Sequence, residues 1–190
     1  GYYIAKDFSP ASQGGNVVYG DGFMLVSNSV GKELAMMKDF FPVPVYATPC
    51  LFAPRESDES LRRNPYINHI DLTMLSIPQK DLLLVDSNHY EQQHKHLEEI
   101  LSDVEIIEVN NGPEWYNWPL NCLVLNDNGS PLVIANYLTE NIQGVLKDLN
   151  IDFETVASED PERNEGSIRC RTNMAENVEI FRMAGLSVTR

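Results

Sequence analysis

Apolar and polar positions recur along this chain in three similar blocks, and each block predicts strand, tight turn, strand, helix and strand. The strands are expected at residues 16–19, 23–26 and 43–46, then 69–75, 82–85 and 104–107, then 122–125, 132–135 and 152–156. The helices are expected at residues 32–40, 89–101 and 140–149. Since no linker separates these ββαβ units, they predict an α/β fold with internal pseudo-symmetry in one domain over residues 1–190.

Turn and cap residues mark the borders of these elements. Asp21–Gly22 and Asn128–Gly129 are hairpin signals, because both pairs accept the positive φ that a two-residue turn needs, and a further turn is expected at 78–80. Thr139 is a suitable N-cap for the third helix. The apolar face predicted for that helix is formed by Ile142, Val145, Leu146 and Leu149. Residues 51–66 are expected to form one long loop, of the kind that often borders a site.

The composition is acidic, with 14 Lys and Arg against 28 Asp and Glu and a formal net charge of -14. Nucleic acids and anionic membranes are therefore poor partners, because both are bound by clustered basic residues. Cationic ligands fit this charge, although acidity also simply serves solubility. The apolar runs are too short to span a membrane.

The N-terminus shows no signal peptide, which fits a cytoplasmic protein or one secreted without a classical signal. The chain begins without Met, as expected if it is processed or lacks an upstream segment.

Three cysteines, widely spaced, indicate neither a disulfide framework nor a zinc ribbon. Cys50 and Cys122 stand in apolar surroundings and are interpreted as small core residues. Cys170 differs, because it lies between Arg169 and Arg171, whose positive charges favour the thiolate over the thiol. Cys170 is therefore the candidate nucleophile.

His69 and Asp71 are two residues apart at the start of a predicted strand, so we expect their side chains on the same face. The plainer alternative is a pair at a strand end that is satisfied by water.

The remaining histidines and the two tryptophans are expected to have structural roles. His89, His94 and His96 fall in one helix, but their spacing does not suit a metal, so a solvated helix face is expected. Trp115 and Trp118 are expected to pack in a loop, with substrate lining as the lesser alternative.

Five segments carry a resemblance to a known family. Residues 4–10 are similar to an aromatic-x-Arg-Asp-x-Gly-Pro motif, and residues 13–16 contain Gly-Gly-Asn before the Asp-Gly turn. His69-Ile70-Asp71 and residues 121–126 are similar to a His-x-Asp strand and an Asn-x-Leu-Val-Leu strand. Residues 168–172 are similar to a nucleophile segment of the form His-Cys-x-Thr. In this order they resemble the guanidine-modifying, pentein-fold enzymes, most closely the bacterial peptidylarginine deiminases and agmatine deiminases.

The resemblance implies a β/α propeller of five ββαβ blades with a central site. It implies that Asp7 and Asp71 bind the substrate guanidinium and that Cys170 attacks its carbon. It implies that His69 acts as acid and base and that Asn121 positions the substrate. The family chemistry needs no metal or organic cofactor, and the calcium sites of the animal enzymes are not carried over.

The departures from the family pattern bear on the substrate. Arg169 stands where His usually precedes the nucleophile, and the connection after Asp7 is short. Gln13 stands where agmatine deiminases have Glu, which favours arginine in a peptide or protein, converted to citrulline and ammonia. Deimination of agmatine or free arginine, amidino transfer, and a non-catalytic binding module remain alternatives.

Overall fold

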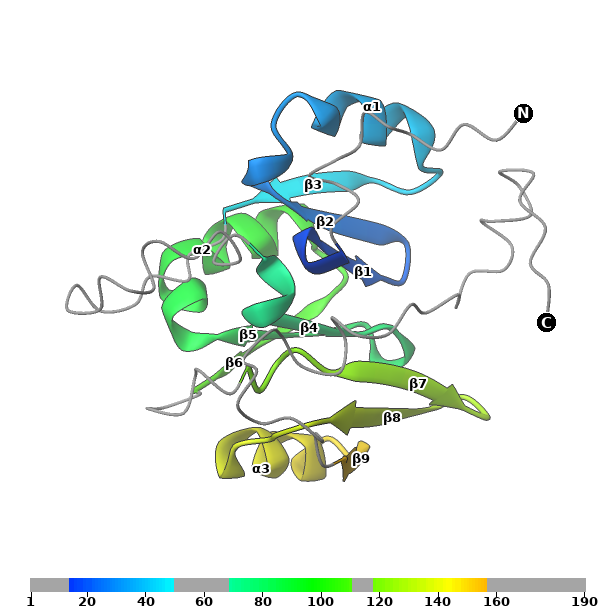
Figure 1. The fold of residues 1–190 in the computed structure, drawn as a ribbon, viewed down its shortest axis with the longest axis vertical. Helices are drawn as coiled ribbons and strands as arrows, with labels where there is room; N and C mark the ends of the chain where they lie inside the picture. Colours follow the sequence, from blue (N-terminus) through cyan, green and yellow to red (C-terminus); the bar gives the residue numbers. More distant parts are fainter. Residues whose placement is uncertain (1–13, 50–68, 111–117, 157–190) are drawn as a thin grey trace.

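Three ββαβ units make up the described part of the chain, and they follow one another along the molecule in Figure 1. The structure, a computed structural model, describes residues 14–49, 69–110 and 118–156. These three ranges are called the first, second and third unit. The strands are β1 (Val17–Gly20), β2 (Phe23–Ser27), β3 (Val45–Thr48), β4 (Met74–Ile77), β5 (Leu82–Asp86), β6 (Glu105–Val109), β7 (Leu123–Asp127), β8 (Ser130–Ala135) and β9 (Asp152–Thr155). The helices are α1 (Glu33–Phe40), α2 (Ser87–Ile100) and α3 (Glu140–Asp148), with short 3-10 helices η1 (Gly14–Asn16), η2 (Asn28–Val30), η5 (Ile70–Leu72) and η6 (Pro78–Lys80).

Each unit forms its own three-stranded sheet, in the strand orders β1-β2-β3, β4-β5-β6 and β7-β8-β9. The first two strands of a unit pair antiparallel through a short turn. The second and third pair parallel, because the helix between them carries the chain back to the same end of the sheet. The three units predicted from the sequence are thus confirmed. The five-bladed ring stays a prediction.

The turns form at the predicted residues in all three units, but only the turn of the third unit has both of its residues at positive φ. Asn128 and Gly129 have φ values of 53° and 91°, as a two-residue turn with both residues in the left-handed region requires. In the first hairpin only Gly22, with φ 74°, lies in the positive region. In the second unit the turn expected at residues 78–80 is the 3-10 helix η6, which begins at Pro78 and is followed by Asp81 with φ 50°. Proline at the start of a helix has the required φ already, so this longer connection is favoured.

Two of the three hydrophobic clusters lie between units, because the middle sheet is buried on both faces, and the third lies within the first unit. Leu75 and Leu84 on one face of this sheet pack into a cluster with Val133 and Ile142 of the third unit. On the opposite face, Met74, Leu83 and Val85 pack into a cluster with Val18, Phe23 and Leu25 of the first unit and with Leu97 and Leu101 at the end of α2. All residues of β4 and β5 are buried, which fits their largely apolar sequences, Met-Leu-Ser-Ile and Leu-Leu-Leu-Val-Asp.

The third helix forms as the sequence predicts. The Thr139 side chain accepts a hydrogen bond from the backbone N–H of Ile142 at 3.3 Å, which confirms the N-cap. Ile142 and Leu146 are buried, and Val145 and Leu149 pack against the same cluster. In the described ranges, no helix has the length and apolarity needed to cross a membrane.

Candidate functional site

The segments that precede the first strand of each unit gather at one end of the sheets. η1 leads into β1, η5 leads into β4, and residues 118–122 lead into β7. The strand registers place these segments beside the last residues of the central strands, since Val17 pairs with Val26 and Met74 pairs with Val85. η1 and η5 also contact each other, as do β1 and β4. The fold thereby brings His69, Asp71 and Asn121 to the same end of their sheets.

Asp71 and Asn121 form a buried pair between the second and third units. Each is 0% exposed, and the Asn121 Nδ2 donates to the Asp71 Oδ2 at 2.7 Å. The same Nδ2 lies 3.5 Å from the Asp71 backbone oxygen, which it also contacts. A carboxylate removed from water is costly unless it is hydrogen-bonded, so this amide fixes both the position and the orientation of the Asp71 carboxylate.

His69 lies beside this pair at the start of η5, with its side chain partly exposed. Burial lowers the pKa of His69, and the nearby charge of Asp71 acts in the opposite direction. His69 is therefore a neutral base at neutral pH that remains close to a negative charge. A group of this kind can accept and return a proton.

The predicted strand placement of His69 and Asp71 is wrong. Both precede β4, and Asp71 lies in the 3-10 turn of η5. The backbone N–H of Thr73 donates to the Ile70 oxygen at 3.0 Å, which closes this turn before the strand begins. Asn121 likewise precedes β7, which starts at Leu123. Asp71 and Asn121 therefore meet because the turns before β4 and β7 lie at the same end of the sheets, and not because side chains alternate along a strand.

Gly15 packs its backbone against the His69 ring. A Cβ atom built at Gly15 would overlap the Nδ1, Cγ and Cβ atoms of His69. The Gly-Gly-Asn segment therefore needs a glycine here for close approach, a requirement that the sequence pattern alone did not assign. Asn16, which follows, is also buried.

The expectation that His89 lies on a solvated helix face is wrong, because this residue is 0% exposed. Its Nε2 lies 3.3 Å from the Thr48 hydroxyl, and its Nδ1 lies 3.2 Å from the Thr73 hydroxyl. The spacing along α2 could have indicated this burial. His89 lies eight residues before the buried Leu97, and this spacing places both residues on the same helix face. His96 is exposed, and the part of the chain that is described holds no group of three potential metal ligands.

Of the three cysteines, Cys122 lies within the described residues. Cys122 is a buried core residue, 1% exposed, whose Sγ donates to the Pro119 oxygen at 3.1 Å, and this prediction is confirmed. Trp118 is half-buried. The other expected residues of the site or its surroundings lie outside the described residues, namely Asp7, Gln13, Cys50, Trp115, Arg169 and Cys170.

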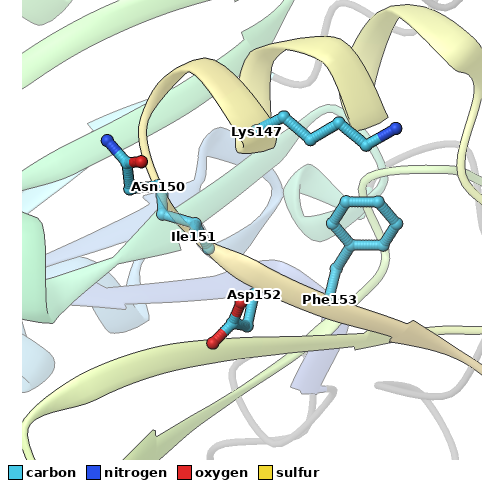
Figure 2. Close-up of a pocket in the computed structure, with 5 residues that line it drawn as sticks. All are labelled: Lys147, Asn150, Ile151, Asp152 and Phe153. Carbon is cyan, nitrogen blue, oxygen red and sulfur yellow. The ribbon is translucent and has the colours of Figure 1, made fainter.

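A shallow pocket lies elsewhere, between the end of α3 and the start of β9. Figure 2 shows its lining residues, with Lys147 on the helix and Asp152 and Phe153 on the strand. The Lys147 Nζ lies 5.8 Å from the centre of the Phe153 ring. Asp152 pairs with Leu132 near the hairpin of the third unit, whereas Asn121 lies at the other end of that sheet. This pocket is therefore separate from His69, Asp71 and Asn121.

Comparison with known proteins identifies the fold. No family model and no curated protein matches this sequence. Among solved structures, the N-terminal domain of ArgZ with a covalently bound reaction intermediate matches with a TM-score of 0.62 at 13% identity, over 82% of this chain and 53% of that one. ArgZ is an arginine dihydrolase from the ornithine-ammonia cycle in cyanobacteria. The chain has the pentein fold.

Two amidinotransferases support the assignment of the pentein fold. SxtG, of the saxitoxin biosynthetic pathway of Microseira wollei, matches with a TM-score of 0.56 at 19% identity, over 82% of this chain and 42% of its own. The inosamine-phosphate amidinotransferase of Streptomyces griseus matches with a TM-score of 0.53 at 14% identity, over 82% and 44%. The chain thus spans about half the length of these proteins. The resemblance drawn from the sequence is confirmed at the level of the fold.

Proposed function

We propose that this protein is a cysteine-dependent hydrolase that deiminates a guanidinium group, with arginine in a peptide or protein as substrate and citrulline and ammonia as products. The observation that carries the proposal is the buried Asp71 carboxylate, held by Asn121 at 2.7 Å beside the partly exposed imidazole of His69. The pentein fold, shared with an arginine dihydrolase and two amidinotransferases, supports the same class of chemistry.

The substrate cation suits the Asp71 carboxylate. A guanidinium is planar, and its paired N–H groups match the two oxygens of a carboxylate. The Asn121 amide orients the Asp71 carboxylate, so the substrate meets a group that needs no further ordering. Asp7 is proposed as the second carboxylate, and Asn121 also contacts the substrate.

The reaction proposed for Cys170 and His69 begins with proton transfer from the thiol to the neutral imidazole. The thiolate sulfur then forms a bond to the guanidinium carbon. The carbon–nitrogen bond breaks, and His69 gives its proton to the departing ammonia. His69 next takes a proton from water, whose oxygen attacks the same carbon. The carbon–sulfur bond breaks as the new hydroxyl loses its proton to solvent and becomes the ureido carbonyl, and His69 returns its proton to the sulfur, which restores the thiol and the neutral imidazole. No metal or organic cofactor takes part in this sequence.

The preference for peptide-bound arginine rests on the sequence. Gln13 stands where agmatine deiminases have an acidic residue, and the net charge of -14 attracts basic substrates. We also propose that the whole chain forms one domain in which the units close into a ring, because Asp7 and Cys170 must reach the end of the sheets that carries Asp71.

The first experiment measures citrulline and ammonia release from peptidyl-arginine, free arginine and agmatine. We expect activity in the wild type, greatest on peptidyl-arginine, and none with Cys170→Ala. Asp71→Asn removes the charge that binds the cation, so KM should rise about tenfold or more. Asp152→Asn is the matched control, because it removes an exposed carboxylate at the opposite end of the third sheet. Activity that survives Cys170→Ala would rule out the mechanism.

Amidino transfer is the second candidate, because two of the structural relatives are amidinotransferases. It predicts that an added acceptor amine receives the amidino group, while ammonia release stays low. A non-catalytic binding module is distinguished by labelling with a haloacetamidine. The enzyme should be labelled at Cys170 and not at Cys122, which is 1% exposed. Failure to label Cys170 would favour the binding module.

A further inference from the structure

His89 is a fully buried imidazole in the first turn of α2, outside the chemistry proposed above. Its ring lies between two threonine hydroxyls that come from different units. The Thr48 hydroxyl, at the end of β3, is 3.3 Å from Nε2, and the Thr73 hydroxyl is 3.2 Å from Nδ1. Both ring nitrogens are therefore hydrogen-bonded, as a buried polar group requires.

The hydrogen-bond pattern assigns the proton of this ring. The Thr73 hydroxyl donates its only hydrogen to the Ile70 backbone oxygen at 3.1 Å, so it can only accept from His89. His89 consequently carries its proton on Nδ1, and its Nε2 accepts from the hydroxyl of Thr48. The chain of donors runs from Thr48 through His89 and Thr73 to Ile70.

Thr73 connects this chain of hydrogen bonds to the turn that holds Asp71. Its backbone N–H and its hydroxyl both donate to the Ile70 oxygen, at 3.0 and 3.1 Å. Its own carbonyl accepts from the Asp86 N–H at 2.9 Å. Asp86 in turn caps α2 by accepting from the Asn88 N–H at 3.0 Å. The start of α2 thus holds Thr73 from two sides, and Asp71 lies within the turn that Thr73 closes.

We propose that His89 is a positioning residue for the guanidinium site, acting through Thr73 to fix the turn that presents Asp71 to Asn121 and to the substrate. A single 3-10 turn has weak hydrogen bonds of its own and needs such support. The expected effect of His89 on the reaction rate rests on the proposed function. The expected effect of His89 on the position of Asp71 rests on the contacts of His89 alone.

The kinetic test replaces Thr73. Thr73→Val removes the hydroxyl and keeps the shape, so kcat should fall by about tenfold to a hundredfold through misplacement of Asp71. Thr73→Ser keeps the hydroxyl and should recover most of the rate. The matched control is Thr139→Val, which removes a buried hydroxyl that caps α3 in the third unit. It should lower the melting temperature while kcat stays near the wild-type value.

A second pair of variants separates the two nitrogens of His89. Asn places an amide donor near the position of Nδ1, whereas Gln reaches the position of Nε2. His89→Asn should therefore retain more activity than His89→Gln, because only the contact to Thr73 leads to Asp71. Equal losses in the two variants, in proportion to their loss of stability, would reduce His89 to a structural residue and overturn the proposal.

A readout without turnover keeps this proposal separate from the proposed function. The titration of the His69 ring, followed by NMR, senses the distance to the Asp71 charge. Thr73→Val should shift the His69 titration, and Thr139→Val should leave it unchanged. If the wild type is inactive, the proposed enzymatic function is wrong, and the His69 titration alone then tests whether His89 positions the turn. An unchanged His69 titration in Thr73→Val would overturn the role of His89 whether or not the protein is an enzyme.

Discussion

Gly15 gives the sharpest prediction at the scale of single residues. Gly15→Ala would push its new methyl group into the His69 ring, so we expect the ring to move and ammonia release to be lost. Gly144→Ala is the control, because a Cβ at Gly144 in α3 meets nothing within 4 Å. It should keep the activity and stabilise the protein by about 0.5–1 kcal/mol, since alanine is the better helix former. Full activity in Gly15→Ala would show that the His69 ring position is not critical.

The buried imidazole of His89 should make the stability of the folded protein depend on pH. Burial lowers the pKa of His89 from 6.5 to about 4. Between these two pH values the unfolded chain binds a proton at this position and the folded protein does not. The free energy of unfolding should therefore fall by about 3 kcal/mol as the pH drops through this range.

Urea unfolding at pH 7 and at pH 4.5 measures this effect. His89→Asn should lose less stability than the wild type between the two pH values, because Asn does not titrate. His96→Asn, at an exposed position of the same helix, should behave like the wild type. A wild type and a His89→Asn variant with the same pH dependence would exclude this origin.

The sequence indicated the residues of the site better than their supports. The residue pattern points to His69 and Asp71, because ionisable groups begin a predicted apolar strand there, whereas Asn121 is indicated only by the resemblance to the pentein-fold enzymes. Their contacts depend on the meeting of two units, which no local pattern encodes. His89 and Gly15 were missed for a related reason. The role of each residue depends on a contact with a residue far along the chain, which is Thr48 for His89 and His69 for Gly15.

At the scale of elements, the hairpin of the third unit gives a stability prediction. Gly129 has φ 91°, and a Cβ there would meet nothing within 4 Å. Gly129→Ala should thus cost only the backbone strain, about 1–2 kcal/mol. Thermal unfolding measures this against Gly144→Ala, and no loss in Gly129→Ala would show that the turn relaxes to another type.

The elements themselves were largely predictable, because apolar periodicity and turn residues are local signals. The helix at 140–149 is observed as Glu140–Asp148, and the strand at 132–135 lies within Ser130–Ala135. The sequence predicts a strand over residues 69–75, in which Ile70, Leu72 and Met74 alternate with polar residues. The Thr73 N–H bonds back to Ile70 instead, which starts the strand only at Met74. Hydrogen bonding inside a short turn overrides alternation there.

At the scale of the whole molecule, burial is greatest in the middle. Both faces of the β4-β5-β6 sheet are covered, whereas three of the four residues of β9 are exposed. We expect the backbone amides of Leu83 and Leu84 to exchange with solvent only on global unfolding. The amides of β9 should exchange sooner, by local opening. Hydrogen exchange followed by mass spectrometry measures both, and equal rates would contradict this order.

The separation of the sheets has a consequence for how the chain is made. Among the described residues, the strands of each sheet lie within residues 17–48, 74–109 or 123–155, and none of these strands is shared between units. A ribosome therefore delivers all the described strands of one sheet before the first described strand of the next. Each unit can pair its strands during synthesis and dock on the preceding one as it emerges, so single strands remain without a partner only briefly.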